Sequence, residues 1–263
     1  MIFNWNQTLL QLLPEFTRAR GPYLYTRKGD RYLDLWLMGG FALMGHRAGR
    51  ITQVLKNRVS TGLVFDLPSI HQKRLIKTLE REFPEYGNFR IYNSWEQAKS
   101  SIETTLDRTQ ITICDPLLTN NGGIAALWRP FAPDFKELPQ VILPVFPFQI
   151  GGGPVIAGFK KKHKAPVNEF LASPLLCEAL TRSIYDLKKF IPPCINTDLT
   201  AINNWNYQHF YFIPRYSESE YQEIFKCFLS NKIIISPHHH CPSFLCAEIS
   251  NGDTKKLINL LKL

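Results

Sequence analysis

The densest group of reactive side chains in the sequence is the run at residues 238–241, in which three histidines precede a cysteine. Imidazole and thiolate suit zinc or copper, and such a site could recruit Cys246 or Asp253. Neighbouring residues of an extended chain point to opposite sides, however, so at most two of the four can readily face one ion. We therefore expect a polar connecting loop and no bound metal. The weak candidates for metal ligands are His238, His240 and Cys241.

Two other positions place a useful side chain where a secondary-structure element should begin or end. Asp115 follows the apolar run 111–114, where its carboxylate could cap the following turn. Ser94 begins the sequence Ser-Trp-Glu-Gln, which fits a capping box in which Ser94 and Gln97 satisfy each other's end of a helix. His46, Cys114 and Asp115 are further candidates for catalytic side chains, although the sequence specifies no arrangement among them.

Hydrophobic periodicity and turn residues predict an alternation of helices and strands along the chain. One right-handed crossover can join the strands 89–92 and 111–114 through the helix 94–106, as adjacent parallel strands. The stretch 116–140 should be irregular or hold a short helix at 124–128. The tail, residues 191–263, should form one small sheet backed by helices. The other expected helices are 51–63, 70–82, 168–190, 217–229 and 253–262, and the other expected strands are 141–146, 208–213, 232–236 and 243–248.

Five segments occur in a characteristic order along the chain. They are the aromatic-rich hairpin at 21–34, Gly45-His46 before a helical stretch, the strand and helix start within 81–98, the strand that ends at Asp115, and the glycine run at 151–153. In this order they resemble the class III aminotransferases, a pyridoxal-phosphate-dependent group of fold type I that includes glutamate-1-semialdehyde aminotransferase. The resemblance implies an α/β fold with a reduced large domain that has a mostly parallel sheet, and a small C-terminal α/β domain. It also implies that Ser94 lies near the cofactor phosphate and Asp115 near the pyridine nitrogen.

The resemblance fails at the positions that would hold the coenzyme. Phe148 stands where the family has the lysine that forms the Schiff base and then moves protons. The nearest later lysines, at 160, 161, 162 and 164, could replace it only if the loop folded back. The shortness of the link at 107–109 implies the loss of further strands and of the aromatic residue that stacks on the pyridine ring.

The phosphate-binding helix start also departs from the family, because Trp95 and Glu96 replace glycine and threonine. A phosphate must approach the backbone closely at a helix N-terminus, and glycine permits that approach. Trp95 would fill the space, and Glu96 would repel the anion by about 4 kcal/mol per unit charge at about 4 Å. Glu169 falls where the family's partner subunit supplies a threonine to the same phosphate.

The composition of the 263 residues is that of an ordered globular protein, with 44% hydrophobic and 13% aromatic residues. The net charge of +9 could assist binding to nucleic acid or to an anionic surface. The basic residues are scattered, and we interpret their one compact cluster, at 160–164, as a solvated loop. Nucleic acid is therefore not an expected partner.

The six cysteines show no paired CxxC spacing and are typical of reduced core thiols in an intracellular protein. The N-terminus lacks the basic start and cleavage site of a signal peptide, and no apolar run approaches the roughly eighteen residues of a membrane span. We therefore expect a cytoplasmic protein with no membrane partner.

Three functions are compatible with these features. The first is a degenerate class III aminotransferase-like protein without transaminase turnover, with three domains at 1–63, 64–190 and 191–263, which binds a small metabolite or a protein partner. It would need no cofactor, and it would form a homodimer or a heteromer with a full-length relative. The second is an active enzyme of the same class, which would bind pyridoxal phosphate through a displaced lysine or use other chemistry in the cleft. The third is a basic module that binds nucleic acid or a surface. Whether the chain is an enzyme stays open, with the first function favoured.

Overall fold

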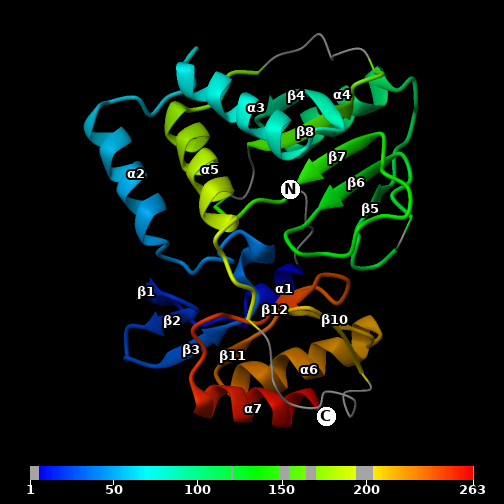
Figure 1. Ribbon diagram of the computed structural model, residues 1–263. Coiled ribbons are helices and arrows are strands. Elements are labelled where there is room, and N and C mark those ends of the chain that lie inside the picture. The colour runs from blue at the N-terminus through cyan, green and yellow to red at the C-terminus, as the bar shows by residue number, and fades with distance from the viewer. Residues whose placement is uncertain (1–5, 120, 149–153, 164–169, 194–203, 263) are drawn as a thin grey trace. The chain divides into compact units, whose positions relative to one another are not determined.

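A computed structural model of the protein describes residues 6–119, 121–148, 154–163, 170–193 and 204–262. The chain forms two compact units, one within residues 49–189 and the other within residues 3–48 and 190–263 (Figure 1). Segments from the two ends of the chain therefore share one unit. Each helix in the described part of the chain is too short or too polar to cross a lipid bilayer.

A five-stranded sheet forms the centre of the unit at 49–189, with the strand order β4-β8-β7-β6-β5. The strands β5, β6 and β7 run parallel to one another, whereas β8 is antiparallel to both β7 and β4. The sheet is therefore mixed: four strands run in one direction and β8 alone opposes them, so the prediction of a mostly parallel sheet is confirmed in part. The strands are β4 (Tyr86–Tyr92), β5 (Ile113–Cys114), β6 (Ala125–Trp128), β7 (Val141–Pro144) and β8 (Val155–Lys160).

The strand β6 replaces the short helix considered at 124–128. Its residues 125–127 are buried, and the strand pairs with β5 on one side and β7 on the other. A short buried apolar run has the same appearance in a strand and in a helix, which is why the sequence pattern did not reveal it. The expected adjacency of β4 and β5 is also wrong, since these strands form the two opposite edges of the sheet.

Four helices belong to the same unit, and α5 contacts both α2 and α3 (Figure 1). The predicted bounds of α3 are confirmed, and Ser69 caps the helix by accepting a hydrogen bond from the Gln72 N–H at 3.4 Å. The helix expected from residue 168 begins only at Pro174. The Gln72 side chain holds the preceding segment outside the helix, because it donates to the Phe170 carbonyl and accepts from the Ala172 N–H. The helices are α2 (Gly49–Ser60), α3 (Ile70–Glu82), α4 (Trp95–Thr105) and α5 (Pro174–Leu187).

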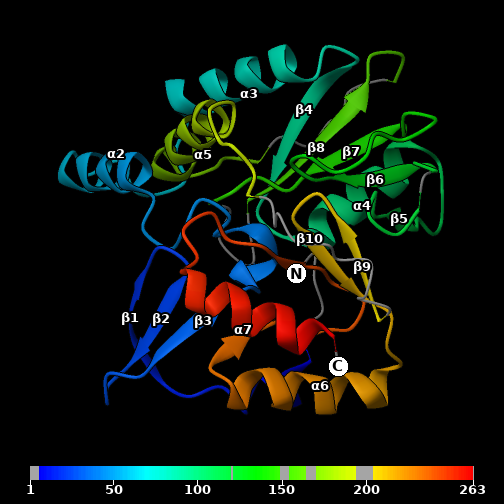
Figure 2. The same cartoon turned by 60° about the horizontal axis from the view of Figure 1, so that its bottom comes forward.

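The second unit contains two small sheets, with strand orders β1-β2-β3-β11 and β12-β10-β9 (Figure 2). The predicted hairpin at 21–34 is confirmed as β2 and β3, and β1 extends it. The single sheet expected in the tail is wrong, because β11 pairs in parallel with β3. The strands are β1 (Phe16–Arg20), β2 (Tyr23–Thr26), β3 (Arg31–Asp34), β9 (Trp205–Gln208), β10 (Tyr211–Pro214), β11 (Ile233–Ile234) and β12 (Ser243–Phe244).

The strand predicted at 208–213 is in fact the turn and second strand of the hairpin β9–β10. His209 in this turn has a φ of 55°, so the chain reverses where the apolar pattern alone indicated continuity. The helices of this unit are α1 (Gln7–Leu10), α6 (Glu218–Ser230) and α7 (Asn251–Leu261), and a 3₁₀ turn spans Leu37–Gly40.

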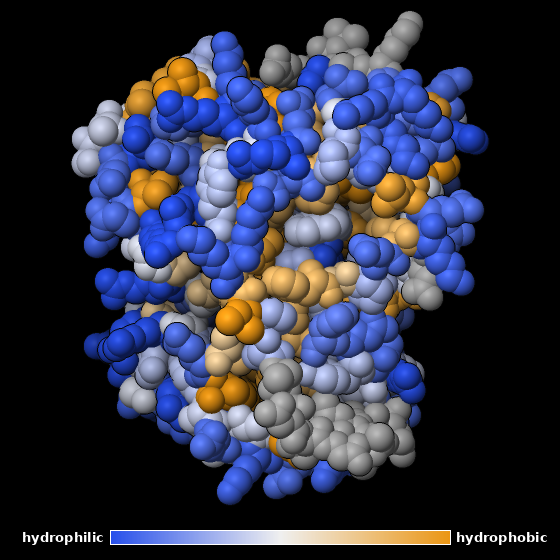
Figure 3. All heavy atoms as spheres, viewed as in Figure 1, coloured by the Kyte–Doolittle hydropathy of each residue, from blue (hydrophilic) through white to orange (hydrophobic). Residues whose placement is uncertain are grey.

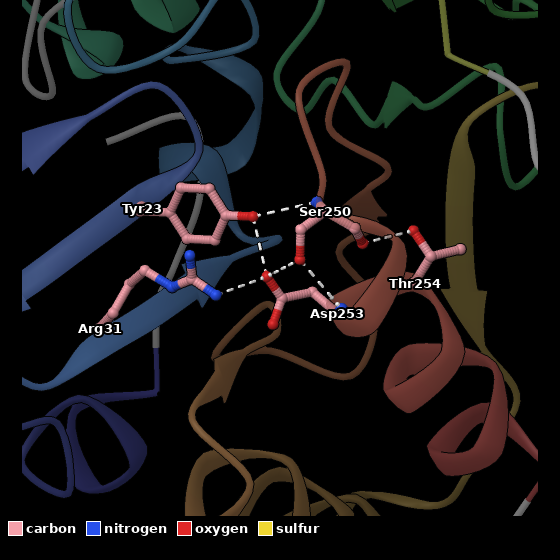
Figure 4. A network of polar contacts seen from close by, with 5 residues as sticks. All are labelled: Tyr23, Arg31, Ser250, Asp253 and Thr254. Carbon is pink, nitrogen blue, oxygen red and sulfur yellow. Dashed lines mark hydrogen bonds and ion pairs between the residues drawn. The ribbon is translucent and has the colours of Figure 1, made fainter.

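The carboxylate of Asp253 ties the start of α7 to the hairpin β2–β3 (Figure 4). Its Oδ2 accepts hydrogen bonds from the Tyr23 hydroxyl at 2.9 Å, the Arg31 guanidinium at 3.0 Å and the Ser250 hydroxyl at 2.7 Å. Burial raises the pKa of Tyr23, and the neighbouring Asp253 raises it further. Asp253 therefore serves to position α7.

Candidate functional site

The N-terminus of α4 is the first of the positions where the resemblance placed a cofactor. Ser94 accepts a hydrogen bond from the Gln97 N–H at 3.2 Å, which confirms its predicted role as a helix cap. The Gln97 side chain reaches back to the Asn93 N–H at 3.1 Å, one residue before the N–H that a capping box would use. Side chains of the protein therefore accept hydrogen bonds from backbone N–H groups at the start of α4.

Glu96 adds a negative charge to the first turn of α4. Its own backbone N–H lowers the pKa of the Glu96 carboxyl, and the Ser94 hydroxyl lowers it further. The helix dipole favours this negative charge, which would repel an incoming anion at the same helix end. The indole of Trp95 is half-buried beside it.

The second position is Asp115, which follows β5 and forms an ion pair with Arg129, the residue after β6. The Arg129 Nε lies 3.0 Å from Oδ1 and 2.9 Å from Oδ2, and its Nη2 lies 2.7 Å from Oδ2. Oδ1 also accepts a hydrogen bond from the Leu117 N–H at 3.1 Å. The Arg129 side chain is 2% exposed and that of Asp115 is 12% exposed, so this is a largely desolvated, charge-assisted contact.

The sheet order separates Ser94 from Asp115. Ser94 follows β4 at one edge, Asp115 follows β5 at the other edge, and three strands lie between them. Four strand spacings put β4 and β5 about 19 Å apart. Arg129 stands between the two positions in the strand order, at the end of β6.

The third position, Phe148, follows β7 and is half-buried with a φ of 75°. Of the later lysines, Lys160 is the last residue of β8, and its Nζ donates to the Leu138 carbonyl at 2.7 Å. Val155 at the other end of β8 pairs with Tyr92, next to the start of α4. The length of β8 therefore puts Lys160 roughly 17 Å from that end of the sheet. Residues 149–153, Lys164 and Glu169 lie outside the described residues.

His46 lies in the other unit, where its Nε2 is 2.8 Å from Oδ2 of Asp34. Asp34 is 1% exposed, and its Oδ1 accepts hydrogen bonds from the N–H groups of Trp36 and Leu37. These contacts fix the turn after β3. Cys114, the third candidate for other chemistry, is half-buried in β5.

The histidine run forms a tight turn, because the Cys241 N–H donates to the His238 carbonyl at 3.0 Å and the His240 N–H donates to the Nδ1 of His238 at 3.1 Å. Burial lowers the pKa of His238, and the neighbouring imidazoles lower it further. Of the two residues that could complete a site, Asp253 positions α7, and the Cys246 thiol donates to the Asp34 carbonyl at 3.2 Å. Among the described residues, no three histidine, cysteine or acidic side chains form a group that could hold a metal ion.

Sequence reasoning missed Arg129, the residue that most changes the surroundings of Asp115. A basic residue at the end of the apolar run 125–128 was the available signal, since charged side chains are almost never fully buried unless paired. This signal identifies Arg129 as the partner of Asp115 only if the run 125–128 is recognised as a strand next to β5.

No protein-family model matches the chain. The chain is 27% identical over 268 residues to an uncharacterized protein of Borreliella burgdorferi, covering 97% of this chain and 93% of that protein. It is 31% identical over 176 residues to an uncharacterized protein of Treponema pallidum, covering 65% of this chain and 52% of the relative. It is also 30% identical over 88 residues to glutamate-1-semialdehyde 2,1-aminomutase of Thermus thermophilus, which is 34% of this chain and 21% of the enzyme.

Two solved structures are similar to nearly the whole chain. An omega-transaminase of Sphaerobacter thermophilus matches with a TM-score of 0.65 at 12% identity, covering 98% of this chain and 92% of that one. Ornithine aminotransferase of Plasmodium yoelii matches with a TM-score of 0.65 at 12% identity, covering 95% and 92%. The chain therefore has the α/β fold of the class III aminotransferases, fold type I.

Proposed function

We propose that this chain is a degenerate class III aminotransferase-like protein that does not carry out transamination and acts by binding. The contact between Arg129 and Asp115 carries this proposal. Pyridoxal phosphate would need a carboxylate that is available to its pyridine nitrogen, whereas Arg129 and the Leu117 N–H already engage both oxygens of Asp115. Withdrawing Asp115 would leave the buried guanidinium without its counterion, which is costly.

The two other positions support the same conclusion. Glu96 brings a carboxylate to the helix end that would receive the phosphate, and Phe148 has no amine with which to form a Schiff base. The residues present therefore do not fit the coenzyme, and we propose no bound cofactor and no metal.

Spectroscopy with pyridoxal phosphate tests this proposal. We expect no internal aldimine absorbance at stoichiometric coenzyme, and borohydride should label exposed lysines only weakly and without preference. The variant Lys160→Ala is the control for a displaced lysine and should behave as the unaltered protein does. Reduction that labels a single mapped lysine at full occupancy would contradict the proposal and favour the active-enzyme alternative.

An exposed apolar surface around the α2–α3 connection supports a role in binding another polypeptide. Figure 3 shows small groups of hydrophobic side chains among polar ones at the upper left, near this connection. Phe65 is 74% exposed, and such clusters on soluble proteins commonly mark interaction sites. The exposed apolar residues of this region are Val59, Leu63, Phe65, Leu67 and Ile70.

We propose that this surface forms a homodimer or a heteromer with a full-length aminotransferase relative, in the cytoplasm. Light scattering after size-exclusion chromatography should give a mass above that of one chain, either alone or with the relative. The variant Phe65→Ser should reduce that mass, whereas Leu118→Ser, an exposed leucine elsewhere, should leave it unchanged. The mass of a single chain, both alone and in the presence of the relative, would rule out the protein-partner role.

A further inference from the structure

A cavity of about 340 Å³ lies in the unit at 49–189, between the C-terminal ends of α3 and α5 and the ends of β6 and β7. Its wall is dominated by aromatic and aliphatic side chains. The rings of Phe83, Trp128 and Phe146 form one side, with centroids 5.1 Å apart for Phe83 and Trp128 and 5.3 Å apart for Trp128 and Phe146. The remaining apolar wall residues are Pro130, Phe131, Ile184 and Leu187. Such a wall suits a flat, apolar ligand body.

Charged residues are confined to one side of this cavity. The Lys188 Nζ lies 2.7 Å from Oε1 of Glu82, and the Arg81 Nε lies 3.6 Å from the same oxygen. Two cations therefore converge on one carboxylate, so this cluster of three side chains has a net positive charge; of the two cations, only Lys188 lines the cavity. The Lys188 side chain is 50% exposed, whereas that of Glu82 is 18% exposed. Lys188 is thus the charged group that can most easily turn toward an anion.

One wall residue has an unusual backbone conformation. Phe131 has a φ of 59°, in the left-handed region that aromatic residues rarely adopt. Residues in such conformations concentrate at sites that clamp ligands. The cavity wall therefore combines a strained backbone at Phe131 with the charged residues at its edge.

We propose that this cavity binds a small organic anion with a planar apolar body and one carboxylate. The body would lie among Phe83, Trp128 and Phe146, and the carboxylate would pair with Lys188. The wall contains none of Ser94, Asp115 and Phe148. The proposal therefore stands whether or not the coenzyme positions are functional.

Titration calorimetry with three indole probes tests the proposal. Indole-3-propionate carries the carboxylate, indole-3-propanol is its neutral counterpart, and tryptamine carries an ammonium group. We expect indole-3-propionate to bind up to about fivefold more tightly than the alcohol, as expected for one half-exposed ion pair, and tryptamine to bind more weakly than either. Equal binding of all three probes, tighter binding of tryptamine, or no binding of indole-3-propionate at millimolar concentration would overturn the proposal.

Two surface variants locate the carboxylate contact. Lys188→Gln should weaken binding of indole-3-propionate roughly fivefold and leave the neutral alcohol unaffected. Lys189→Gln is the matched control, because this neighbour is exposed and does not line the cavity. Leu187→Phe should reduce the affinity of both probes, provided that circular dichroism shows a native fold. If Lys188→Gln binds the anion as well as Lys189→Gln does, the proposed head-group contact is wrong.

Discussion

The pair formed by Asp115 and Arg129 offers the sharpest test of the proposal that Asp115 has a structural role and does not serve a coenzyme. If Asp115 serves to neutralise Arg129, then Asp115→Asn must destabilise the fold. If Asp115 is instead kept for a ligand, the same substitution should have little effect on the unliganded protein or should stabilise it. Asparagine preserves the shape of the side chain and can still accept from the Leu117 N–H, so the main change is the loss of negative charge.

The expected size of the effect follows from burial. The Arg129 side chain is 2% exposed, and loss of one partner from a buried ion pair costs about 3–5 kcal/mol, because the other charge stays desolvated. Asp115 is 12% exposed, which allows water to reach the vacated side of the guanidinium. We therefore expect Asp115→Asn to lower the free energy of unfolding by about 3 kcal/mol, at the lower end of this range.

The double variant Asp115→Asn/Arg129→Met separates loss of charge from loss of packing. Methionine fills much of the space of the arginine stem without a charge, so the double variant leaves no desolvated charge without a counterion. The double variant should therefore regain most of the stability that Asp115→Asn loses. Asp134→Asn, an exposed aspartate in the same unit, should change the free energy of unfolding by less than about 0.5 kcal/mol.

Urea unfolding provides the measurement, followed by circular dichroism and by tryptophan fluorescence. Trp95 and Trp128 lie in the unit that contains the pair, and Trp36 and Trp205 lie in the other, so fluorescence follows the unfolding of both units. A loss below 1 kcal/mol for Asp115→Asn, or a double variant no more stable than the single one, would refute a structural role for Asp115.

Three further predictions concern stability and are measured by the same urea titrations. Burial lowers the pKa of His71 below the value of about 6.5 that it has in the unfolded chain. The contribution of neutral His71 to stability is therefore present above about pH 6.5 and is lost as the pH falls through the lower folded value. The variant His71→Gln should flatten this decline in the free energy of unfolding between about pH 6.5 and pH 5. Gly158→Ala should cost about 1–3 kcal/mol, because a Cβ there would lie 2.8 Å from Cζ of buried Phe89, and Phe89→Leu in the same chain should restore part of the loss. Ser250→Ala should cost about 1 kcal/mol, since the hydroxyl caps α7 by accepting from the Asp253 N–H, and an unchanged midpoint would contradict that role.

The elements that could be predicted from the sequence are those with local signals. The helix at 70–82 was recognised because Ser69 provides a cap and Leu75 and Leu79 provide a buried face. The hairpin at 21–34 was recognised from two aromatic-rich runs around Gly29, which has a φ of 87°. In both cases a few neighbouring residues contain the physical cause of the structure.

The strand order could not be predicted in the same way, because it depends on pairing between distant segments. The strand at 125–128 owes its conformation to β5 and β7, and the position of β11 beside β3 depends on residues about 200 positions apart. The same limit applied to the site. Phe148, Trp95 and Glu96 could be recognised as replacements one residue at a time, whereas the partner of Asp115 could be found only once the strand that carries Arg129 was known.

These observations suggest how such a fold can lose a coenzyme and stay folded. A site that binds a charged cofactor leaves charges and helix ends unsatisfied when it is empty, and those groups reduce the stability of the unliganded protein. Here Ser94 caps the helix end, Glu96 adds a negative charge to its first turn, and Arg129 neutralises the strand-end carboxylate. Because each replacement stabilises the empty state on its own, restoring a lysine at position 148 alone would add an amine and leave both internal counterions in place. If the proposed function is right, loss of the coenzyme is a property of several coupled positions, and Phe148 at the expected lysine position is only one of them.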